Sequence, residues 1–468
     1  MVALALIPEA ISFSIIAGVD PRVGLYASFT MAVAIALTGG RPAMISAATG
    51  AMALVVVSLV DEHGVEYLLA ATILAGLLQV VLGALGVAKL MRFVPRSVMT
   101  GFVNALAILI ALAQLPHLVG EGPLVYVLVA AGLAIIYLVP RLTTAVPAPL
   151  VAIVVLTALV VGAGLSVPDV GDEGRLPDAL PVLGIPAVPL HFETLTIVAP
   201  YVLTLAVVGL LESLMTAKLV DDITETTSDK DRESRGQGIA NVVTGLFGGM
   251  AGCAMIGQTM INVRVSGART RLSTASAGIF LLALVVGLGS VVAVIPMAAL
   301  VAVMLLVAAS TFDWHSIAPA TVRRMPLGET LIMLVTVAAT VATHNLAIGV
   351  GLGVLTAMAV FARRVAHLVD VDRIVDPDGT TSIYAVSGEV FFASDQELID
   401  AFDYADDPPN VLIDLSRAHL WDASAVAALD AIERHYARHG VEVEITGLND
   451  RSQELHRTLS GQLEGAHA

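Results

Sequence analysis

The chain has 468 residues, 57% of them hydrophobic and only 14% charged, which excludes an ordinary soluble protein because too little polar surface is available to face water. The formal net charge of −16 divides into −2 for residues 1–365 and −14 for residues 366–468, so a membrane part precedes an acidic, soluble tail that argues against nucleic-acid binding. The single cysteine, Cys253, excludes an intramolecular disulfide and any multi-cysteine metal site.

The membrane part is identified by its charge-free stretches. Stretches long enough for one span or more are 42–60, 67–88, 97–120, 142–168, 194–211 and 272–312, and shorter spans are expected at 24–38, 236–249 and 254–262. The run 330–362 would be about 50 Å long as one helix, against a hydrocarbon core of about 30 Å, so it is predicted to turn near residues 343–345. These stretches predict fourteen membrane segments.

The loops between the segments differ strongly in charge. With a cytoplasmic N-terminus, sixteen Lys and Arg residues of the membrane part fall on the inner side, and only Arg22 and Arg175 fall on the outer side. Glu9 and Glu212 are 203 residues apart, and the same offset separates the Ala-Met pairs at 51–52 and 254–255. The segments are therefore interpreted as two groups of seven, about 1–168 and about 194–365, with the second copy inverted.

Segment 3 (42–60) and segment 10 (254–262) are expected to begin inside the membrane, after the glycine pairs at 39–40 and 248–249 respectively. Two helix N-termini aimed at one point present unpaired N–H groups and positive dipole ends to an anion. The alternative is that their small residues only permit close helix packing, but the shared offset favours a site. The expected substrate-binding residues are Thr49, Gly50, Ala51, Cys253, Ala254, Met255, Ile256, Gln258 and Thr259. Gln258 can orient an anion but adds no fixed charge, and its alternative role is a helix-packing hydrogen bond.

Glu9 and Glu212 are carboxylates within apolar segments, where an acid is costly and usually faces a cavity or a partner. Each is expected to bind the coupling ion, a proton or Na+. Thr216 lies one turn beyond Glu212, and Na+ is expected at Glu212, Thr216, Gly252 and Cys253. The alternatives are a position at the membrane edge for Glu9 and near the cytoplasmic end for Glu212. Packing or interfacial roles are expected for Gln79, Asn104, His117 and His344.

Two ordered motifs resemble the signature of the SulP family of anion transporters: IPEAISFSIIAGVDP at 7–21, and QGIAN at 237–241 with GARTRLS at 267–273. The resemblance extends over essentially the whole chain. It implies an all-α membrane domain of seven plus seven inverted repeats, in which a core domain rocks against a gate domain. It also implies an anion between the N-termini of segments 3 and 10, a cation-coordinating acid at Glu212 and a proton-coupling acid at Glu9. Because the first segment normally follows a short leader, we expect the natural chain to begin upstream of Met1.

After residue 370, strands and helices alternate, which predicts a small α/β domain. Strands are predicted at 382–386, 389–393, 411–415 and 441–446, and helices from 394, over 422–438 and from 450. The sequence VLIDLS at 411–416, followed by WDAS at 421–424, resembles the STAS domain that ends SulP transporters. Asp422 and Ser424 are expected to cap the second helix. The expected domains are a transmembrane domain at 1–365, a linker at 366–380 and the STAS domain at 381–464.

The sequence therefore predicts a secondary active transporter of small anions, not an enzyme, that works by alternating access. The expected substrates belong to the sulfate, bicarbonate or dicarboxylate class, and no cofactor is expected besides co-transported H+ or Na+. Alternatives are an anion channel or uncoupled exchanger on the same scaffold, a membrane-bound sensor, and a nucleobase carrier of similar fold. We expect a homodimer in a bacterial-type cytoplasmic membrane, with a cytoplasmic STAS domain that binds a regulatory protein.

Overall fold

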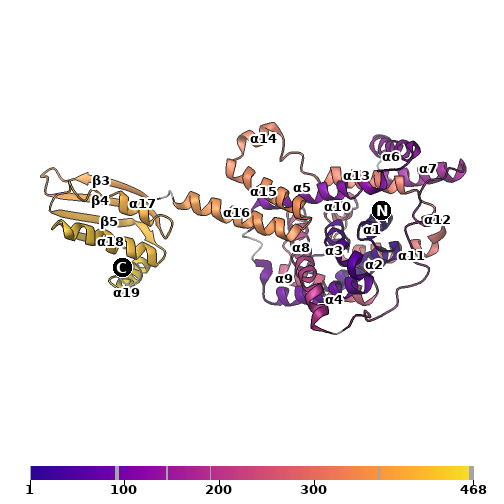
Figure 1. The fold of residues 1–468 in the computed structure, drawn as a ribbon, viewed down its shortest axis with the longest axis horizontal. Helices are drawn as coiled ribbons and strands as arrows, with labels where there is room; N and C mark the ends of the chain where they lie inside the picture. Colours follow the sequence, from indigo (N-terminus) through magenta and orange to yellow (C-terminus); the bar gives the residue numbers. More distant parts are fainter. Residues whose placement is uncertain (1, 90–93, 144–145, 190, 367–368, 463–468) are drawn as a thin grey trace. The chain divides into compact units, whose positions relative to one another are not determined.

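The computed structural model describes residues 2–89, 94–143, 146–189, 191–366 and 369–462. They form two compact units, whose boundary between Val354 and Leu355 falls inside the helix Leu346–Ala366 (Figure 1). The described part of the first unit is helical apart from one antiparallel pair of short strands, and the second unit contains a four-stranded sheet.

The helices that begin in the first unit are α1 (Val2–Ile16), α2 (Pro21–Thr38), α3 (Gly50–His63), α4 (Val65–Ala84), α5 (Arg96–Leu112), α6 (Pro123–Leu142), α7 (Ala148–Gly162), α8 (Phe192–Thr224), α9 (Lys230–Leu246), α10 (Ile256–Met260), α11 (Arg271–Gly287), α12 (Gly289–Ala293), α13 (Met297–Thr311), α14 (Pro319–Arg324), α15 (Leu327–Thr343) and α16 (Leu346–Ala366). Most of the long ones overlap the expected stretches, but α6 was not among them, and α9 begins at Lys230, before the span expected at 236–249. A π-helical turn at Ile261–Val265 extends α10. Six described stretches, containing α2, α4, α5, α6, α8 and α16, are long and apolar enough to cross a bilayer. Shorter apolar helices, among them α1, α7 and α11, accompany them.

The turn predicted near residues 343–345 is confirmed. Helix α15 ends at Thr343, His344 adopts a left-handed backbone conformation with φ of 52°, and α16 begins at Leu346. The Asn345 side chain accepts a hydrogen bond from the Ala347 N–H at 3.0 Å and so satisfies one of the free donors at the start of α16.

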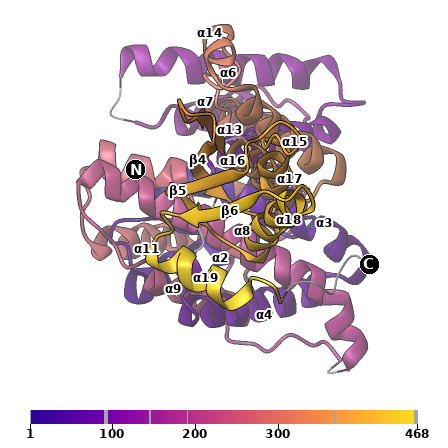
Figure 2. The same cartoon turned by 90° about the vertical axis from the view of Figure 1, so that its left-hand side faces the viewer.

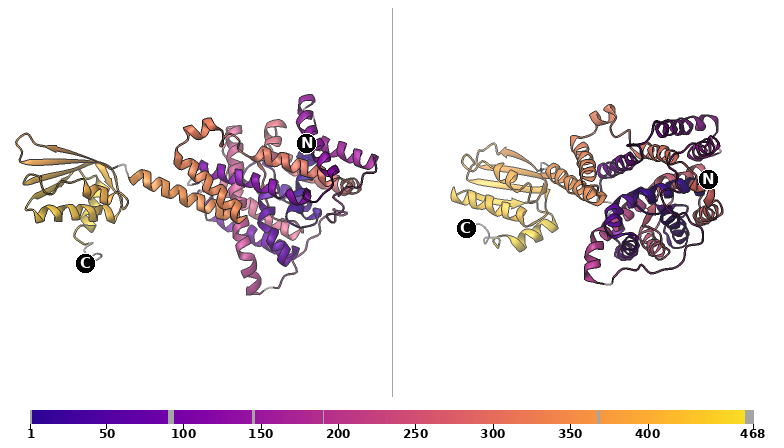
Figure 3. Two further views of the ribbon diagram at one scale, coloured as in Figure 1. Left: turned by 45° about the horizontal axis from the view of Figure 1, so that its top comes forward. Right: turned by 45° about the vertical axis from the view of Figure 1, so that its right-hand side comes forward.

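The helices of the first unit pack as two groups. In the first group, α4 packs against α8 and α9, and α2 packs against α1, α9 and α11. In the second group, α5 packs against α13 and α15, while α6 packs against α7 and α13. Figures 1 and 3 show the first group around α2, α4 and α9, and the second around α6, α7 and α13.

Two segments that are far apart in the sequence meet between these helices. Strand β1 (Ser46–Ala48) pairs antiparallel with β2 (Gly252–Ala254), and all six residues are buried. Helix α3 begins two residues after β1, and α10 begins two residues after β2. Gly252 permits this close approach, because a Cβ there would lie 2.3 Å from the carbonyl oxygen of Ala47.

The second unit is an α/β domain built on a sheet of order β3–β4–β5–β6. Its elements are β3 (Asp370–Val375), β4 (Thr381–Val390), α17 (Asp395–Asp400), β5 (Asn410–Leu420), α18 (Ala423–Arg438), β6 (Glu442–Thr446) and α19 (Asp450–Leu459). Strands β3 and β4 pair antiparallel, and the other two pairs are parallel. Figure 2 shows β5 and β6 with α18 and α19 beside them.

The second unit differs from the predicted elements in three places. The two strands predicted at 382–386 and 389–393 are a single strand, β4, whose pairing with β5 is shifted by an irregularity between Ala385 and Ser387. Strand β3 occupies part of the range expected as a linker, and its mostly exposed residues explain why no apolar alternation marked it. Asp422 caps α18 by accepting from the Ala425 N–H at 3.0 Å, so that prediction is confirmed, whereas Ser424 lies inside the helix and does not cap it. Residues 367–368 of the expected linker and the domain end expected at 464 lie outside the described residues.

A buried carboxylate connects three elements of the second unit. Asp407 accepts hydrogen bonds from Ser382 at 2.8 Å, from Tyr384 at 2.7 Å and from Tyr436, and it pairs with Arg373 at 2.6 Å. Burial opposes ionisation of this group, but the four donors outweigh that effect and lower the pKa of Asp407. The charged carboxylate therefore holds β3, β4 and α18 together.

Candidate functional site

The first part of the site is the start of α3. The Thr49 hydroxyl oxygen is the N-cap acceptor, at 3.4 Å from the Met52 nitrogen, and Gly50 is the first helical residue. A Cβ at Gly50 would lie 3.0 Å from the Phe13 ring of α1 and 3.1 Å from Ile110 of α5. The α3 start is therefore enclosed by one helix from each packing group.

A short relay joins this helix start to a buried acid. The Cys253 Sγ lies 3.1 Å from the Thr49 hydroxyl, and its thiol donates to Glu212 Oε2 at 2.9 Å. Glu212 is only 7% exposed. On the same face of α8, Thr216 donates to the Glu212 carbonyl oxygen at 2.7 Å, and Ser213 accepts from the Ala254 N–H at 3.1 Å. Helix α8 thus places the Glu212 carboxylate and the Ser213 hydroxyl against β2, with the Thr216 hydroxyl one turn beyond Glu212.

A second acid lies on α1. The Gln258 side-chain amide donates to Glu9 Oε1 at 2.9 Å, which connects α1 with α10. Within the described residues, Glu9 Oε2 and Gln258 Oε1 are buried and have no hydrogen-bond partner. Both atoms are acceptors, so a proton, a cation or water would satisfy them. Glu9 lies in the middle of α1 and not at its end.

The remaining expected substrate residues fall into two sets. Ile256 is the partly exposed first residue of α10, and Ala51 is a buried residue in the first turn of α3. By contrast, the Ala254 N–H is already used by Ser213, and the Met255 N–H donates to the Ile45 carbonyl oxygen at 2.9 Å. Thr259 accepts from the Ile45 N–H at 3.0 Å. Ala254, Met255 and Thr259 thus fasten the strand pair in place.

A row of polar side chains on α9 was not among the residues expected at the site. Glu233, Gln237 and Asn241 are spaced by four residues, and all three are at most 1% exposed. This row, which we call the α9 ridge, faces the strand pair and the loop before β1. The signal was present in the sequence, because polar residues at a spacing of four share one helix face. Two of the three, Gln237 and Asn241, lie in the QGIAN motif that carries part of the family resemblance.

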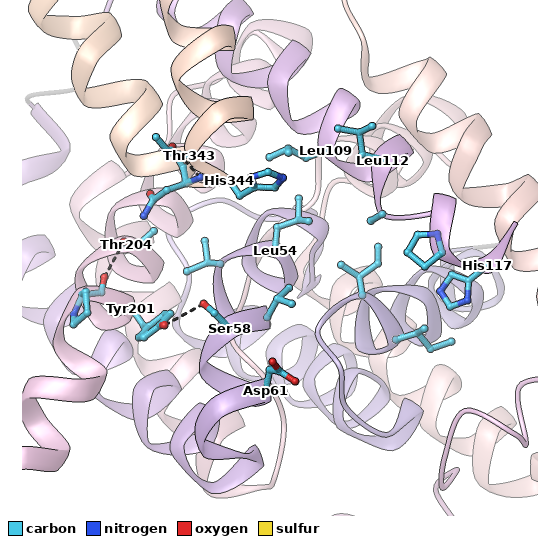
Figure 4. Close-up of a pocket in the computed structure, with 18 residues that line it drawn as sticks. Leu54, Ser58, Asp61, Leu109, Leu112, His117, Tyr201, Thr204, Thr343 and His344 are labelled. Carbon is cyan, nitrogen blue, oxygen red and sulfur yellow. Dashed lines mark hydrogen bonds between the residues drawn. The ribbon is translucent and has the colours of Figure 1, made fainter. Parts of the chain in front are cut away.

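A cavity of about 880 Å³ opens beside the site (Figure 4). It is lined by the C-terminal parts of α1, α3 and α5, by α8 and by the turn between α15 and α16. Tyr201 and Ser58, whose hydroxyl groups lie 3.1 Å apart, line it together with Asp61 and His344. Leu54, one helical turn beyond Gly50, also lines it. The charge bias predicts that all these helix ends face outward, so the cavity leads from the predicted outer side to within one turn of the α3 start.

Comparisons with known proteins bear on the whole chain. Residues 1–124 and 123–336 match the model of the sulfate permease family, and residues 373–460 match the STAS domain. The chain is 54% identical over 460 residues to the "Putative sulfate transporter YbaR" of Bacillus subtilis, covering 98% of this chain and 95% of that protein. It is 26% identical over 492 residues to the "Bicarbonate transporter BicA" of Picosynechococcus, covering 92% of this chain and 84% of that protein.

Solved structures are similar as well. The transmembrane domain of a cyanobacterial bicarbonate transporter, BicA, aligns with a TM-score of 0.65 and 26% identity, covering 76% of this chain and 94% of that chain. The murine anion transporter Slc26a9 in the inward-facing state aligns with a TM-score of 0.82 over 98% of this chain and 86% of that chain. Its sequence identity is 15%, so this likeness concerns the fold.

Proposed function

Because the chain belongs to the sulfate permease family and is an integral membrane protein with a C-terminal STAS domain, we propose that it is a secondary active transporter of small anions. The observation that carries the proposal is the relay from Thr49 through Cys253 to Glu212, with contacts of 3.1 and 2.9 Å, which joins a helix N-terminus to a buried acid. The substrate class is sulfate, bicarbonate or dicarboxylate, carried without covalent chemistry. The coupling ion is H+ or Na+.

The proposed scaffold has fourteen spans in two inverted repeats of seven. The first repeat (about 1–168) comprises α1–α7, and the second (about 194–365) comprises α8–α11, α13, α15 and α16. In support, a short strand precedes the third helix in each group, and the two strands pair antiparallel. The first packing group corresponds to the core, and the second corresponds to the gate. In this proposal the transmembrane domain is 1–365 and the STAS domain is 381–464, as expected from the sequence, and the segment 366–380 between them contributes β3 to the sheet of the second unit.

The anion is proposed to lie at the start of α3, facing the start of α10. The N–H groups of Gly50 and Ala51 supply donors beside the Thr49 hydroxyl, whose proton points to the Cys253 sulfur in the relay, and the positive end of the α3 dipole favours a negative charge. From α10, the partly exposed Ile256 backbone and the Gln258 amide complete the pocket. These groups carry no fixed positive charge. Binding of the anion therefore depends on neutralisation of the nearby acids.

Coupling follows from the placement of Glu212. An ionised, cation-free Glu212 repels an anion at the α3 start, because the two are separated only by the Cys253 and Thr49 side chains. A proton on Glu212 removes this repulsion. Na+ does the same when held by Glu212, the Thr216 hydroxyl and the carbonyl oxygens of Gly252 and Cys253. Binding of the anion and binding of the proton or Na+ therefore favour each other. Glu9, with its unpartnered Oε2, is the second proposed proton site.

Alternating access is proposed to move the gate group against the core group. Phe13 and Ile110 enclose Gly50, and the cavity comes within one turn of it. A displacement of α5 relative to α3 would open the anion site to one side at a time. The alternatives on this scaffold are an anion channel or an uncoupled exchanger.

The STAS domain is proposed to be cytoplasmic and regulatory, in a homodimer within a bacterial cytoplasmic membrane. Trp421 and Phe392, 56% and 63% exposed, lie next to the start of α18. Large exposed apolar side chains of this kind suit the binding of a regulatory protein.

The proposed function is tested in proteoliposomes. Initial uptake of sulfate, bicarbonate and fumarate is measured with and without imposed H+ and Na+ gradients, for the wild type, Glu9→Gln and Glu212→Gln. Glu193→Gln is the matched control, because Glu193 is an exposed acid at the start of the same helix, α8. Gradient-driven uptake that Glu212→Gln abolishes and Glu193→Gln preserves is the expected result. Uptake that ignores both gradients and both acid substitutions refutes coupled transport, and flux that rises with voltage without saturating identifies a channel.

A further inference from the structure

The strand pair β1–β2 places non-helical backbone inside a helical membrane unit. Such backbone is tolerated at membrane depth only where other protein groups or water satisfy its N–H and C=O groups. Each strand pairs with the other on one edge, so the opposite edges need different partners. Those partners hold the strand pair, and with it Cys253, in place.

The α9 ridge supplies the partners of Gly252, while Ser213 of α8 accepts from the Ala254 N–H at 3.1 Å and Ser28 of α2 accepts from the Ala48 N–H at 3.4 Å. Asn241 pairs with Gly252 as a neighbouring strand would, because its Oδ1 accepts from the Gly252 N–H at 2.9 Å and its Nδ2 donates to the Gly252 carbonyl at 3.0 Å. Gln237 donates to the Ser46 hydroxyl at 2.6 Å, on β1. Glu233 accepts from the N–H groups of Gly40 and Arg41 at 2.7 and 2.8 Å, in the loop that leads to β1. One helix face thus contacts both strands and the loop before them.

The ridge is itself held rigidly. Helices α4 and α9 touch through their backbones, since a Cβ at Gly76 would lie 2.6 Å from the Gly238 carbonyl oxygen, and one at Gly238 would lie 2.5 Å from that of Gly76. Gln79 lies one turn beyond Gly76 on α4, and its Oε1 accepts a hydrogen bond from Asn241 Nδ2 at 2.9 Å. This is the third hydrogen bond of the Asn241 side chain. Asn241 is therefore fixed from behind by Gln79 and α4 and bonds to Gly252 in front.

We propose that the α9 ridge, and Asn241 above all, positions β2 and thereby sets where Cys253 and the start of α10 stand in the anion site. These are positioning residues that act through the strand pair. The proposal rests on the proposed function only for its transport readout. Its structural readout uses Cys253, which is the chain's single cysteine and is fully buried.

The test compares alkylation of Cys253 in the purified full-length protein. The rate of reaction with N-ethylmaleimide is followed by intact mass for the wild type, Asn241→Ala, Gln79→Leu and Asn104→Ala. Asn104 is the matched control, because it too is a buried asparagine that donates to one group, Ser316, and accepts from a backbone N–H, at 2.9 and 2.8 Å. It lies on α5, in the other packing group. Thermal unfolding of each variant is recorded in parallel.

Loss of the two Asn241 bonds to Gly252 is expected to raise the labelling rate roughly tenfold or more, because the strand opens locally more often. Gln79→Leu removes the bond that supports Asn241 from behind, together with the 3.4 Å bond from Gln79 to the Ala206 carbonyl of α8, but leaves both Asn241 bonds to Gly252, so its rate should fall between those of the wild type and Asn241→Ala. Asn104→Ala should label at the wild-type rate even if its melting temperature falls. If Asn241→Ala aggregates, the Gln79→Leu rate decides the matter. Labelling of Asn241→Ala or Gln79→Leu no faster than that of Asn104→Ala overturns the proposal.

Uptake kinetics provide the second readout. With whichever of sulfate, bicarbonate and fumarate the wild type takes up, Asn241→Ala should raise the KM, whereas Asn104→Ala should change only the maximal rate per protein. A KM unchanged in Asn241→Ala contradicts the positioning role. Absence of uptake in the wild type would instead refute the proposed function, and the labelling experiment would still decide whether the ridge positions β2.

Discussion

Substitution of Gly252 by alanine should separate the two strands on which the site is built. A Cβ at this position would lie 2.3 Å from the Ala47 carbonyl oxygen and 2.9 Å from its carbonyl carbon, and an ordinary contact begins at 3.4 Å. The obstacle is backbone, which has no rotamer to change. Strand β2 must therefore move by about 1 Å relative to β1.

The size of the effect follows from that shift. A displacement of about 1 Å stretches the hydrogen bonds of the ladder beyond about 3.5 Å, where they contribute little. Overpacking costs about 1–3 kcal/mol, and each lost hydrogen bond costs about 1 kcal/mol, so a total of roughly 2–4 kcal/mol is expected. The shift also exceeds the tolerance of about 0.5 Å within which a preorganised site works.

Two assays measure this prediction. Gly252→Ala should lower the apparent melting temperature in detergent by several degrees and reduce anion uptake by proteoliposomes at least about tenfold, as expected for a displaced site. Gly351→Ala is the control, because a Cβ there meets nothing within 4 Å, and it should leave both quantities unchanged. Wild-type stability and uptake in Gly252→Ala would refute the argument that close approach of β1 and β2 builds the site.

Three further predictions concern the coupling acid, the cavity and the STAS domain. Glu212→Gln cannot ionise but keeps an acceptor for the Cys253 thiol, so it should fold normally and abolish the stimulation of uptake by either cation gradient. Persistent stimulation in this variant would show that Glu212 has no part in coupling. In a Cys253→Ser background, Ser58→Cys should react with an impermeant maleimide added outside intact cells, because Ser58 lines the cavity, and labelling from the inside alone would contradict the orientation. Asp407→Asn should destabilise the second unit by roughly 2–4 kcal/mol, measured by hydrogen exchange of β4 and β5. Because the folded-state pKa of Asp407 is lowered, its contribution is complete above the ordinary value of 3.8 and is lost as the pH falls through the lower folded value, so wild type and variant should converge in acid.

The features that the sequence predicted well depend on local pattern. Charge-free runs marked most of the apolar helices, although α6 was not among the expected stretches, and the excess length of the run 330–362 predicted the turn at His344. In the second unit, alternation of apolar residues marked β5 and β6. It missed β3, whose exposed side chains resemble those of a loop. The motifs identified the family because several of them occur in order.

The features that could not be predicted depend on contacts between distant segments. Nothing in the tripeptides at 46–48 and 252–254 marks them as partners, because the pairing follows from how α2, α8 and α9 pack around them. The relay through Cys253 likewise arises only after β1 and β2 pair, which brings Thr49 and Glu212 to the same thiol. The offset of 203 residues placed both segments near one site. It could not show that the Ala254 and Met255 N–H groups already donate to Ser213 and Ile45.

The pairing of β1 with β2 also has a consequence for biosynthesis. About 200 residues separate the two strands, so at roughly 5–20 residues per second the ribosome needs roughly 10–40 s after making β1 to complete its partner. During that time β1 lacks the backbone partners that β2 later supplies, although Ser28 of α2 already accepts from the Ala48 N–H at 3.4 Å, and each backbone group left unpaired in the bilayer costs several kcal/mol. Crosslinking of a chain stalled near residue 189 should therefore find β1 beside the insertion machinery or water, and lipid contact there would contradict this. The first half of the protein must be sheltered until the second half arrives.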